Sequence, residues 1–217
     1  YRGNAERDLS GGMQRCFKLG RSALIVDQRC SGQSEGNVIT FGVKEHRDCL
    51  AWVDFMVDHF GSDVKIILTG ISMGASTVLM AAGAPLPPQV KGVLADCGFT
   101  SAKAIIQKIC RQLKLPQRPV YFFIRLGARL YGGFSLEEHS PLRALANCKV
   151  PVIFFHGETD DYVPSDMSIR NYEACASRKK LVLVPNAGHG LSYPVAPELY
   201  LSSVREFFGP EGSCRKE

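Results

Sequence analysis

Short apolar runs alternate with longer segments of helical periodicity along most of this chain. The runs are typical of strands that are covered on both faces of a sheet. They lie at residues 22–27, 64–69, 90–95, 151–156 and 180–185. Between them, apolar residues recur every three or four positions, as on one face of a helix. The helices predicted in this way lie at 5–19, 43–60, 165–176 and 197–208. Strand alternating with helix predicts a mostly parallel sheet with helices on both faces.

The segment 100–145 is the least regular part of the chain. Two helical patterns are separated there by Pro116 and Pro119, because proline interrupts a helix. Its aromatic side chains suit an acyl or aromatic pocket, although their helical spacing favours packing between helices. They are Phe99, Tyr121, Phe122, Phe123, Tyr131 and Phe134. The basic residues of the two patterns suit an anionic substrate or a membrane surface, but a solvated helix face is the favoured interpretation. They are Lys103, Lys108, Arg111, Lys114, Arg118, Arg125 and Arg129.

Composition and charge narrow the class of protein. A chain of 217 residues with 45% hydrophobic content suits one domain over residues 1–217. The net charge of +5 comes from dispersed basic residues, whereas nucleic-acid binding needs a concentrated stripe or a known module. No apolar run has the roughly 18 residues of a membrane span, and the chain opens without the pattern of a signal peptide. We therefore expect no nucleic-acid partner and no membrane span in this chain.

The eight cysteines indicate a reduced protein rather than a metal site. They include no C-x-x-C pair and no Cys/His group with zinc-ligand spacing. Some of them, such as Cys49 and Cys110, fall within apolar periodic segments, where a thiol behaves as a small hydrophobic group. A chain of this length does not need disulfides, although an even number permits them. The pattern favours a cytoplasmic location, with a membrane anchor on missing N-terminal residues left open, and no metal.

The stretch Gly70-Ile71-Ser72-Met73-Gly74 carries the first sign of chemistry. G-x-S-x-G between a strand and a helix is the nucleophile elbow, a turn so sharp that its flanking positions must be glycine. The serine hydroxyl is then raised above the sheet edge at the N-terminus of a helix, where negative charge is favoured. This context predicts Ser72 to be a nucleophile rather than a helix-capping serine.

A serine nucleophile needs a base, and the base needs a group that orients it. Asp160 follows the strand at 151–156, and His189 follows the strand at 180–185. Carboxyl ends of parallel strands meet at one edge of a sheet, so both loops should reach Ser72. We predict the catalytic set Ser72, His189 and Asp160. For the acid, Asp161 and Asp96 remain alternatives, whereas His156 is interpreted as a packed structural residue.

At these residues the chain resembles the α/β-hydrolase superfamily, and more narrowly its serine esterase and peptidase-like branch. The H-G-x-x-D-x-x-V-P pattern of that branch matches His156–Pro164 in full. A second pattern, D-x-R-x-x-G-x-S-x-G, matches Asp27–Gly36, although relatives carry glycine where Cys30 stands. The resemblance covers essentially the whole chain. It implies a three-layer α/β-hydrolase fold with a small helical cap or lid at about 100–145.

The resemblance also implies that the chain is truncated at its N-terminus. Such folds carry three further strands before the segment that begins here, and the third of these lies between the runs at 22–27 and 64–69. It ends in a His-Gly pair beside the oxyanion hole, where Tyr1 and Arg2 would follow. We therefore expect the oxyanion to be held by the backbone N–H of Met73, the residue after the nucleophile, and by that of Tyr1 or Arg2.

The activity implied is hydrolysis of a small-molecule carboxylic ester through an acyl-enzyme, without a metal or an organic cofactor. A thioesterase or a peptidase with the same three residues is the nearest alternative, because the shape of the pocket decides between them. A non-catalytic binding protein on a hydrolase fold is the alternative from another class. The sequence leaves acyl chain length, leaving group and oligomeric state open.

Overall fold

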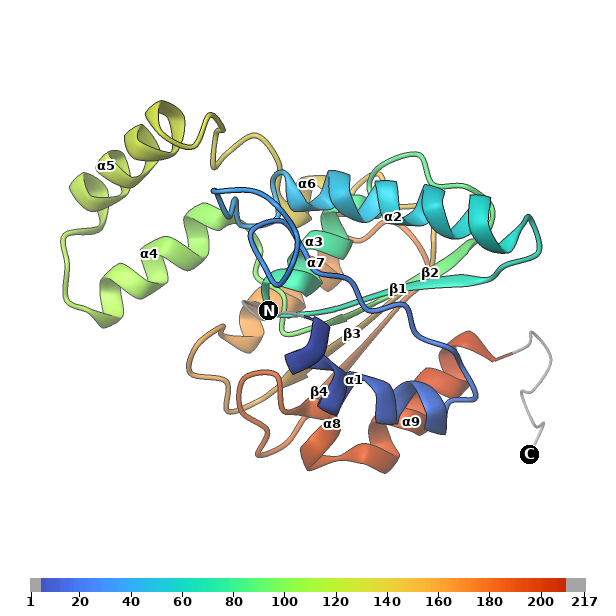
Figure 1. The fold of residues 1–217 in the computed structure, drawn as a ribbon. Coiled ribbons are helices and arrows are strands. Elements are labelled where there is room, and N and C mark those ends of the chain that lie inside the picture. Colours follow the sequence, from blue (N-terminus) through green and yellow to red (C-terminus); the bar gives the residue numbers. More distant parts are fainter. Residues whose placement is uncertain (1–4, 210–217) are drawn as a thin grey trace.

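A computed structural model describes residues 5–209, apart from the side chains of 6–12. Its sheet has four parallel strands in the order β1-β2-β3-β4 (Figure 1). These are β1 (Ile66–Ile71), β2 (Val90–Asp96), β3 (Val152–Gly157) and β4 (Lys179–Val184). The prediction of a parallel sheet is confirmed, and each of these strands begins within two residues of its predicted start.

Helices cover both faces of this sheet, as expected. Figure 1 shows α2, α3 and α6 above the sheet and α1 and α9 below it. The helices are α1 (Ala5–Lys18), α2 (Glu45–Phe60), α3 (Met73–Ala81), α4 (Ala102–Gln112), α5 (Gln117–Leu130), α6 (Pro141–Leu145), α7 (Ser165–Ala174), α8 (Ser192–Val195) and α9 (Pro197–Phe208). The short helices α6 and α8 had no sequence prediction.

Alternation along the strands divides the core into two layers. In β3, Val152 and Phe154 pack with α3 and α7, whereas Ile153 and Phe155 point to the opposite face. There Phe155 stacks on Tyr200 of α9, with 4.0 Å between the ring centroids. Successive side chains of a strand point to opposite faces, so a continuous apolar run supplies both layers. This burial on both sides fixes the sheet that carries the candidate site.

The predicted strand at 22–27 is wrong. These residues have no strand conformation, because a strand needs a neighbour for its backbone hydrogen bonds and the described residues provide none. A cavity of about 1230 Å³ stands between this segment and β1. Ala23, Leu24 and Val26 line one side of it, and residues 66–68 of β1 line another. The apolar run therefore faces a cavity instead of a paired strand.

The loop 27–36, which matched the second hydrolase pattern, is built around Asp27. Its carboxylate accepts a hydrogen bond from the backbone N–H of Gln33 at 3.0 Å. A side chain on Gly32 would collide with that carboxylate, 2.1 Å from the position of its Cβ atom. Cys30 has a φ of +61°, a left-handed conformation that suits the glycine of related sequences. The backbone at position 30 therefore keeps the left-handed conformation of a glycine, although the residue is a cysteine.

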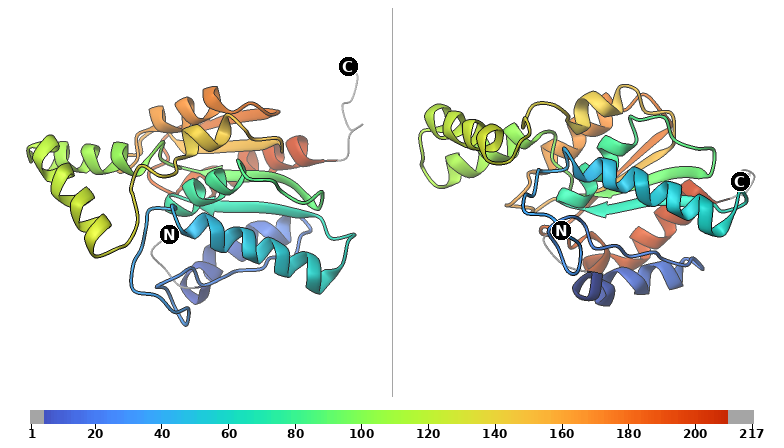
Figure 2. Two further views of the ribbon diagram at one scale, coloured as in Figure 1. Left: turned by 90° about the horizontal axis from the view of Figure 1, so that it is seen from above. Right: turned by 45° about the horizontal axis from the view of Figure 1, so that its top comes forward.

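The segment 100–145 leaves the body of the protein as a pair of helices. Figure 2 shows α4 and α5 extending beyond the carboxyl-end side of the sheet in both views. Phe99, Tyr121 and Phe134 are buried, as core packing predicts. That interpretation is wrong for Phe122, Phe123 and Tyr131, which are exposed because α5 has a second apolar face beside the one that packs on α4. Within residues 5–209, no helix is both long and apolar enough to cross a bilayer.

Candidate active site

The turn predicted to be a nucleophile elbow forms between β1 and α3. Ser72 has φ +57° and ψ −118°, an unfavourable backbone conformation that persists at functional turns when the surroundings enforce it. Its N–H donates to the carbonyl of Asp96 at 2.8 Å, which ties the elbow to β2. A Cβ atom on Gly70 would lie 2.3 Å from the carbonyl carbon of Gly74. Glycine at 70 is therefore required for the strand and the helix to pass so closely.

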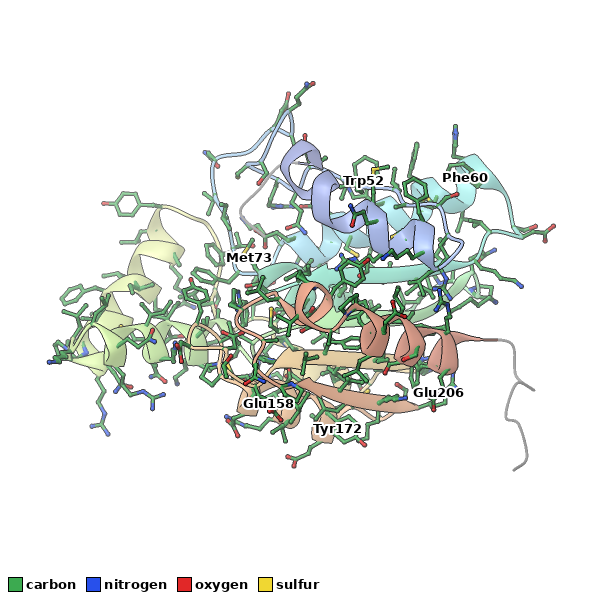
Figure 3. The ribbon with its side chains drawn as sticks, turned by 90° about the horizontal axis from the view of Figure 1, so that it is seen from below. Trp52, Phe60, Met73, Glu158, Tyr172 and Glu206 are labelled. Atoms are coloured by element: carbon green, nitrogen blue, oxygen red, sulfur yellow. The ribbon has the colours of Figure 1, made fainter. Side chains whose placement is uncertain are left out.

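The loops after β3 and β4 bring Asp160 and His189 to this serine. His189 Nε2 lies 2.9 Å from Ser72 Oγ, and His189 Nδ1 lies 2.7 Å from Asp160 Oδ2. A carboxylate only accepts, so Nδ1 carries a proton and Nε2 is left to accept the serine proton. Met73 and Glu158, which are labelled in Figure 3, come after β1 and β3. Both lie towards the end of the molecule from which α4 and α5 project. The predicted hydroxyl, imidazole and carboxylate thus form one hydrogen-bonded chain.

Asp160 is held as a carboxylate although it is buried. Burial alone would raise its pKa, but hydrogen bonds from His156, His189 and the Val163 N–H hold the pKa well below its usual range. The backbone N–H groups of Tyr162 and Val163 donate to Oδ1 at 2.9 Å and 2.8 Å. The carboxylate therefore keeps its charge, which a positively charged imidazole at His189 would need beside it.

His156 contacts the same carboxylate, and this contact was missed by the sequence interpretation. The ring is fully buried, and its Nε2 lies 2.8 Å from the Val163 carbonyl and 3.3 Å from Asp160 Oδ2. A carbonyl only accepts, so Nε2 carries a proton that Asp160 shares. Nδ1 meets the Ser168 hydroxyl at 2.6 Å. The position of His156 four residues before Asp160, across a turn, was the signal available in the sequence.

The two other candidate acids make different contacts. Asp96 is fully buried and accepts from Ser192 at 2.7 Å. Burial raises its pKa, so it suits a structural carboxyl rather than a partner for His189. The Asp161 carbonyl accepts from Lys108 of α4, which also donates to the Tyr162 carbonyl at 2.8 Å. Lys108 therefore ties α4 to residues 158–163, called the acid loop below.

The structure describes one of the two predicted oxyanion donors. Met73 is the first residue of α3, and the first N–H groups of a helix have no carbonyl partner within it. Its N–H belongs to the residue after Ser72, at a helix end that favours negative charge. Tyr1 and Arg2, the predicted source of the second donor, lie outside the described residues. The prediction for these two residues stays a prediction.

One group near the relay has the composition of a metal site. Ligand atoms of Cys97, Asp160 and His189 all lie within 4.8 Å of one another. Burial raises the pKa of the Cys97 thiol, and a thiol must lose its proton to bind a metal well. His189 and Asp160 already bond to each other through the atoms Nδ1 and Oδ2. The donor set therefore suits the hydrogen-bonded relay better than a resident metal.

Comparison of the sequence with known proteins identifies the family of this chain. A model of the prolyl oligopeptidase family matches residues 40–210. The chain belongs to the prolyl oligopeptidase family. Among curated relatives, the uncharacterized protein YqkD of Bacillus subtilis is 32% identical over 190 residues, which are 87% of this chain and 62% of YqkD. Protein bem46 of Schizosaccharomyces pombe is 26% identical over 164 residues, 75% of this chain and 49% of bem46. The chain thus spans only part of the length of these relatives.

The fold of this prolyl oligopeptidase family member is similar to that of solved hydrolase structures. The Pyrococcus furiosus esterase Pf2001 superposes with a TM-score of 0.72 and 25% identity, covering 94% of this chain and 75% of the esterase. A puromycin-hydrolyzing peptidase from Mycobacterium tuberculosis superposes with a TM-score of 0.58 and 22% identity, covering 78% and 26%. Together with the parallel sheet, these likenesses confirm the α/β-hydrolase fold class expected from the motifs.

Proposed function

We propose that this protein is a serine hydrolase that cleaves small carboxylic esters through an acyl-enzyme. The observation that carries the proposal is the hydrogen-bonded chain from Ser72 Oγ through the His189 ring to Asp160 Oδ2, with distances of 2.9 Å and 2.7 Å. Membership of the prolyl oligopeptidase family supports hydrolysis by such a serine. The likeness to an esterase of Pyrococcus furiosus supports an ester as the substrate.

The proposed reaction follows from the protonation states of the relay. Ser72 Oγ attacks the ester carbonyl while His189 Nε2 takes its proton. The ester bond then breaks, and the imidazolium gives the proton to the departing alcohol. Water, deprotonated by the same nitrogen, releases the acid and restores Ser72. Asp160 holds the Nδ1–H tautomer and stabilises the imidazolium, which is why its low pKa matters.

The negative oxygen of the tetrahedral intermediate needs donors of its own. We propose the Met73 N–H as one, at the N-terminus of α3, and the N–H of Tyr1 or Arg2 as the other. Removal of one such donor costs roughly 10²–10³ in rate. The chemistry assigned to these groups requires neither a metal nor an organic cofactor. The seven described cysteines are free thiols, which supports our proposal of a cytoplasmic location.

A peptidase is the second candidate, because a family match and a peptidase structure favour it specifically. The two candidates share the attack by Ser72 and differ in the leaving group, an alcohol or an amine. A series of p-nitrophenyl esters from acetate to palmitate, set against aminoacyl p-nitroanilides, measures the difference as kcat/KM. The proposal expects ester turnover that Ser72→Ala abolishes. Turnover of anilides with equal or greater kcat/KM would make the protein a peptidase instead, and absence of both would indicate a binding protein.

A further inference from the structure

The outer face of α5 is apolar and exposed. Phe122, Phe123, Leu126 and Leu130 have exposed fractions of 50%, 66%, 40% and 69%. Their spacing of three, four and eight residues places them along one side of the helix, and we call them the apolar stripe. The only side chain of α5 that is buried is Tyr121. A helix normally turns its apolar side to the core, so this one needs an explanation.

The stripe is not the face that α5 uses to pack on the protein. Tyr121, with Val120 and Ala128 beside it, packs against Ile106 and Cys110 of α4. This contact already holds the two helices together. Figure 1 shows the pair extending away from the sheet, and the stripe lies on the part of α5 that no other described element covers. Exposed apolar patches of this kind mark interaction surfaces.

Charge around the stripe selects the kind of partner. Residues 101–134 contain seven basic residues and no acidic residue, so this segment is strongly positive although the whole chain has a net charge of only +5. Arg118, Arg125 and Arg129 follow one edge of the stripe at helical spacing. Arg125 lies 3.7 Å from Glu137, whereas Arg118 and Arg129 have no ion pair with any described residue. An apolar surface with a basic edge complements an anionic one.

We propose that α5, with its apolar stripe and arginine edge, docks on the surface of a membrane that contains anionic lipids. A helix with a basic side and an aromatic and aliphatic side lies in the plane of the interface, with the apolar side buried among the acyl chains. The 14 residues of α5 are about 21 Å long, too short to cross a hydrocarbon core of about 30 Å. Docking in the plane is the arrangement that this length permits.

A second copy of the chain fits the surface less well than a lipid does. Two stripes in contact would bring two arginine edges together, and like charges across an interface oppose association. Anionic headgroups supply the complementary charge to both Arg118 and Arg129 without a fixed geometry. Membrane binding is separate from ester hydrolysis and can be measured without turnover.

The test is sedimentation of the protein with vesicles of phosphatidylcholine alone or mixed with phosphatidylglycerol. We expect binding to the mixed vesicles that weakens steeply between 0.05 and 0.5 M salt. Over this range the Debye screening length falls from roughly 14 Å to roughly 4 Å, so screening changes from weak to strong. Phe123→Ser and the pair Arg118→Gln with Arg129→Gln should each weaken binding at least tenfold. Phe17→Ser is the matched control, because Phe17 has the same exposed fraction of 66% on α1, and it should bind like the wild type.

The outcomes that overturn the proposal are distinct. Failure of the wild type to bind mixed vesicles, or equal loss of binding in Phe17→Ser, would exclude α5 as the docking element. If the wild type does not bind vesicles but forms a dimer in sedimentation velocity, and Phe123→Ser is monomeric, the stripe would be assigned to contact with a second copy of the chain. Circular dichroism of each variant shows whether it is folded, and ester turnover without lipid separates this result from a failure of the proposed hydrolase activity.

Discussion

Replacement of His156 by phenylalanine tests whether the buried ring supports Asp160. The substitution keeps a ring of similar size but deletes both nitrogen atoms. Three polar groups would each lose one hydrogen-bond partner, namely the Ser168 hydroxyl at 2.6 Å, the Val163 carbonyl at 2.8 Å and the Asp160 carboxylate at 3.3 Å. All three lie in the interior, so water does not replace the lost hydrogen bonds.

The expected loss follows from these three contacts. Each neutral bond contributes about 1 kcal/mol and a bond to a charged group about 1.5–3 kcal/mol, so His156→Phe should lower the free energy of unfolding by about 3–5 kcal/mol. Ser168→Ala removes only the first contact, and we expect it to cost about 1 kcal/mol. The difference between the variants isolates the contribution of Asp160 and Val163.

Urea unfolding at pH 7 measures the size of this loss in the free energy of unfolding. Unfolding at pH 3 tests whether the charge of Asp160 contributes to the stability. Because the pKa of Asp160 is held well below its usual range in the folded protein, its donors contribute fully above about pH 4 and less as the pH falls below that value. Both proteins should therefore be less stable at pH 3 than at pH 7. A gap between the wild type and His156→Phe under about 0.5 kcal/mol at pH 7 would be the size of an ordinary surface substitution and would show that the buried ring does not support Asp160.

Three further substitutions act on the elbow and the relay. Asp160→Asn presents an amide that cannot accept as a carboxylate does, so the His189 ring should adopt the wrong tautomer and kcat on a p-nitrophenyl ester should fall about 10⁴-fold; a loss below tenfold would contradict this role. Gly70→Ala places a Cβ atom 2.3 Å from the Gly74 carbonyl carbon, so both the melting temperature and the turnover should drop, and a melting temperature like that of the wild type would contradict the packing. Lys108→Met removes the donor to two acid-loop carbonyls, and kcat/KM should fall about 10- to 100-fold, the equivalent of one charged hydrogen bond; unchanged kcat/KM would show that α4 does not position the loop.

The sequence predicted the parts of this protein that depend on local pattern and chain order. β3 begins with four apolar residues, Val152–Phe155, and is buried at every position; such a run is enough to place the strand inside a sheet with two covered faces. Once the sheet is parallel, the residues that follow β1, β3 and β4 must meet at one edge. This is why Ser72, Asp160 and His189 could be brought together from their order alone.

The parts that were missed depend on neighbours that sequence does not show. Segment 22–27 has the composition of a strand, but a strand exists only when another lies beside it. The apolar spacing of α5 predicts a helix and does not say whether Phe123 meets protein or solvent, because both cases share one period. His156 was interpreted as packing, since its contact with Asp160 arises only when the intervening turn folds back.

Covalent labelling measures whether the hydroxyl at 72 is an activated nucleophile. The protein is treated with a fluorophosphonate at neutral pH, digested, and the adduct located by mass spectrometry. We expect one adduct on Ser72. It should be absent in Ser72→Ala and form much more slowly in His189→Ala, which lacks the base 2.9 Å from the hydroxyl. Labelling of another residue, or none at all in the full-length protein, would contradict this expectation.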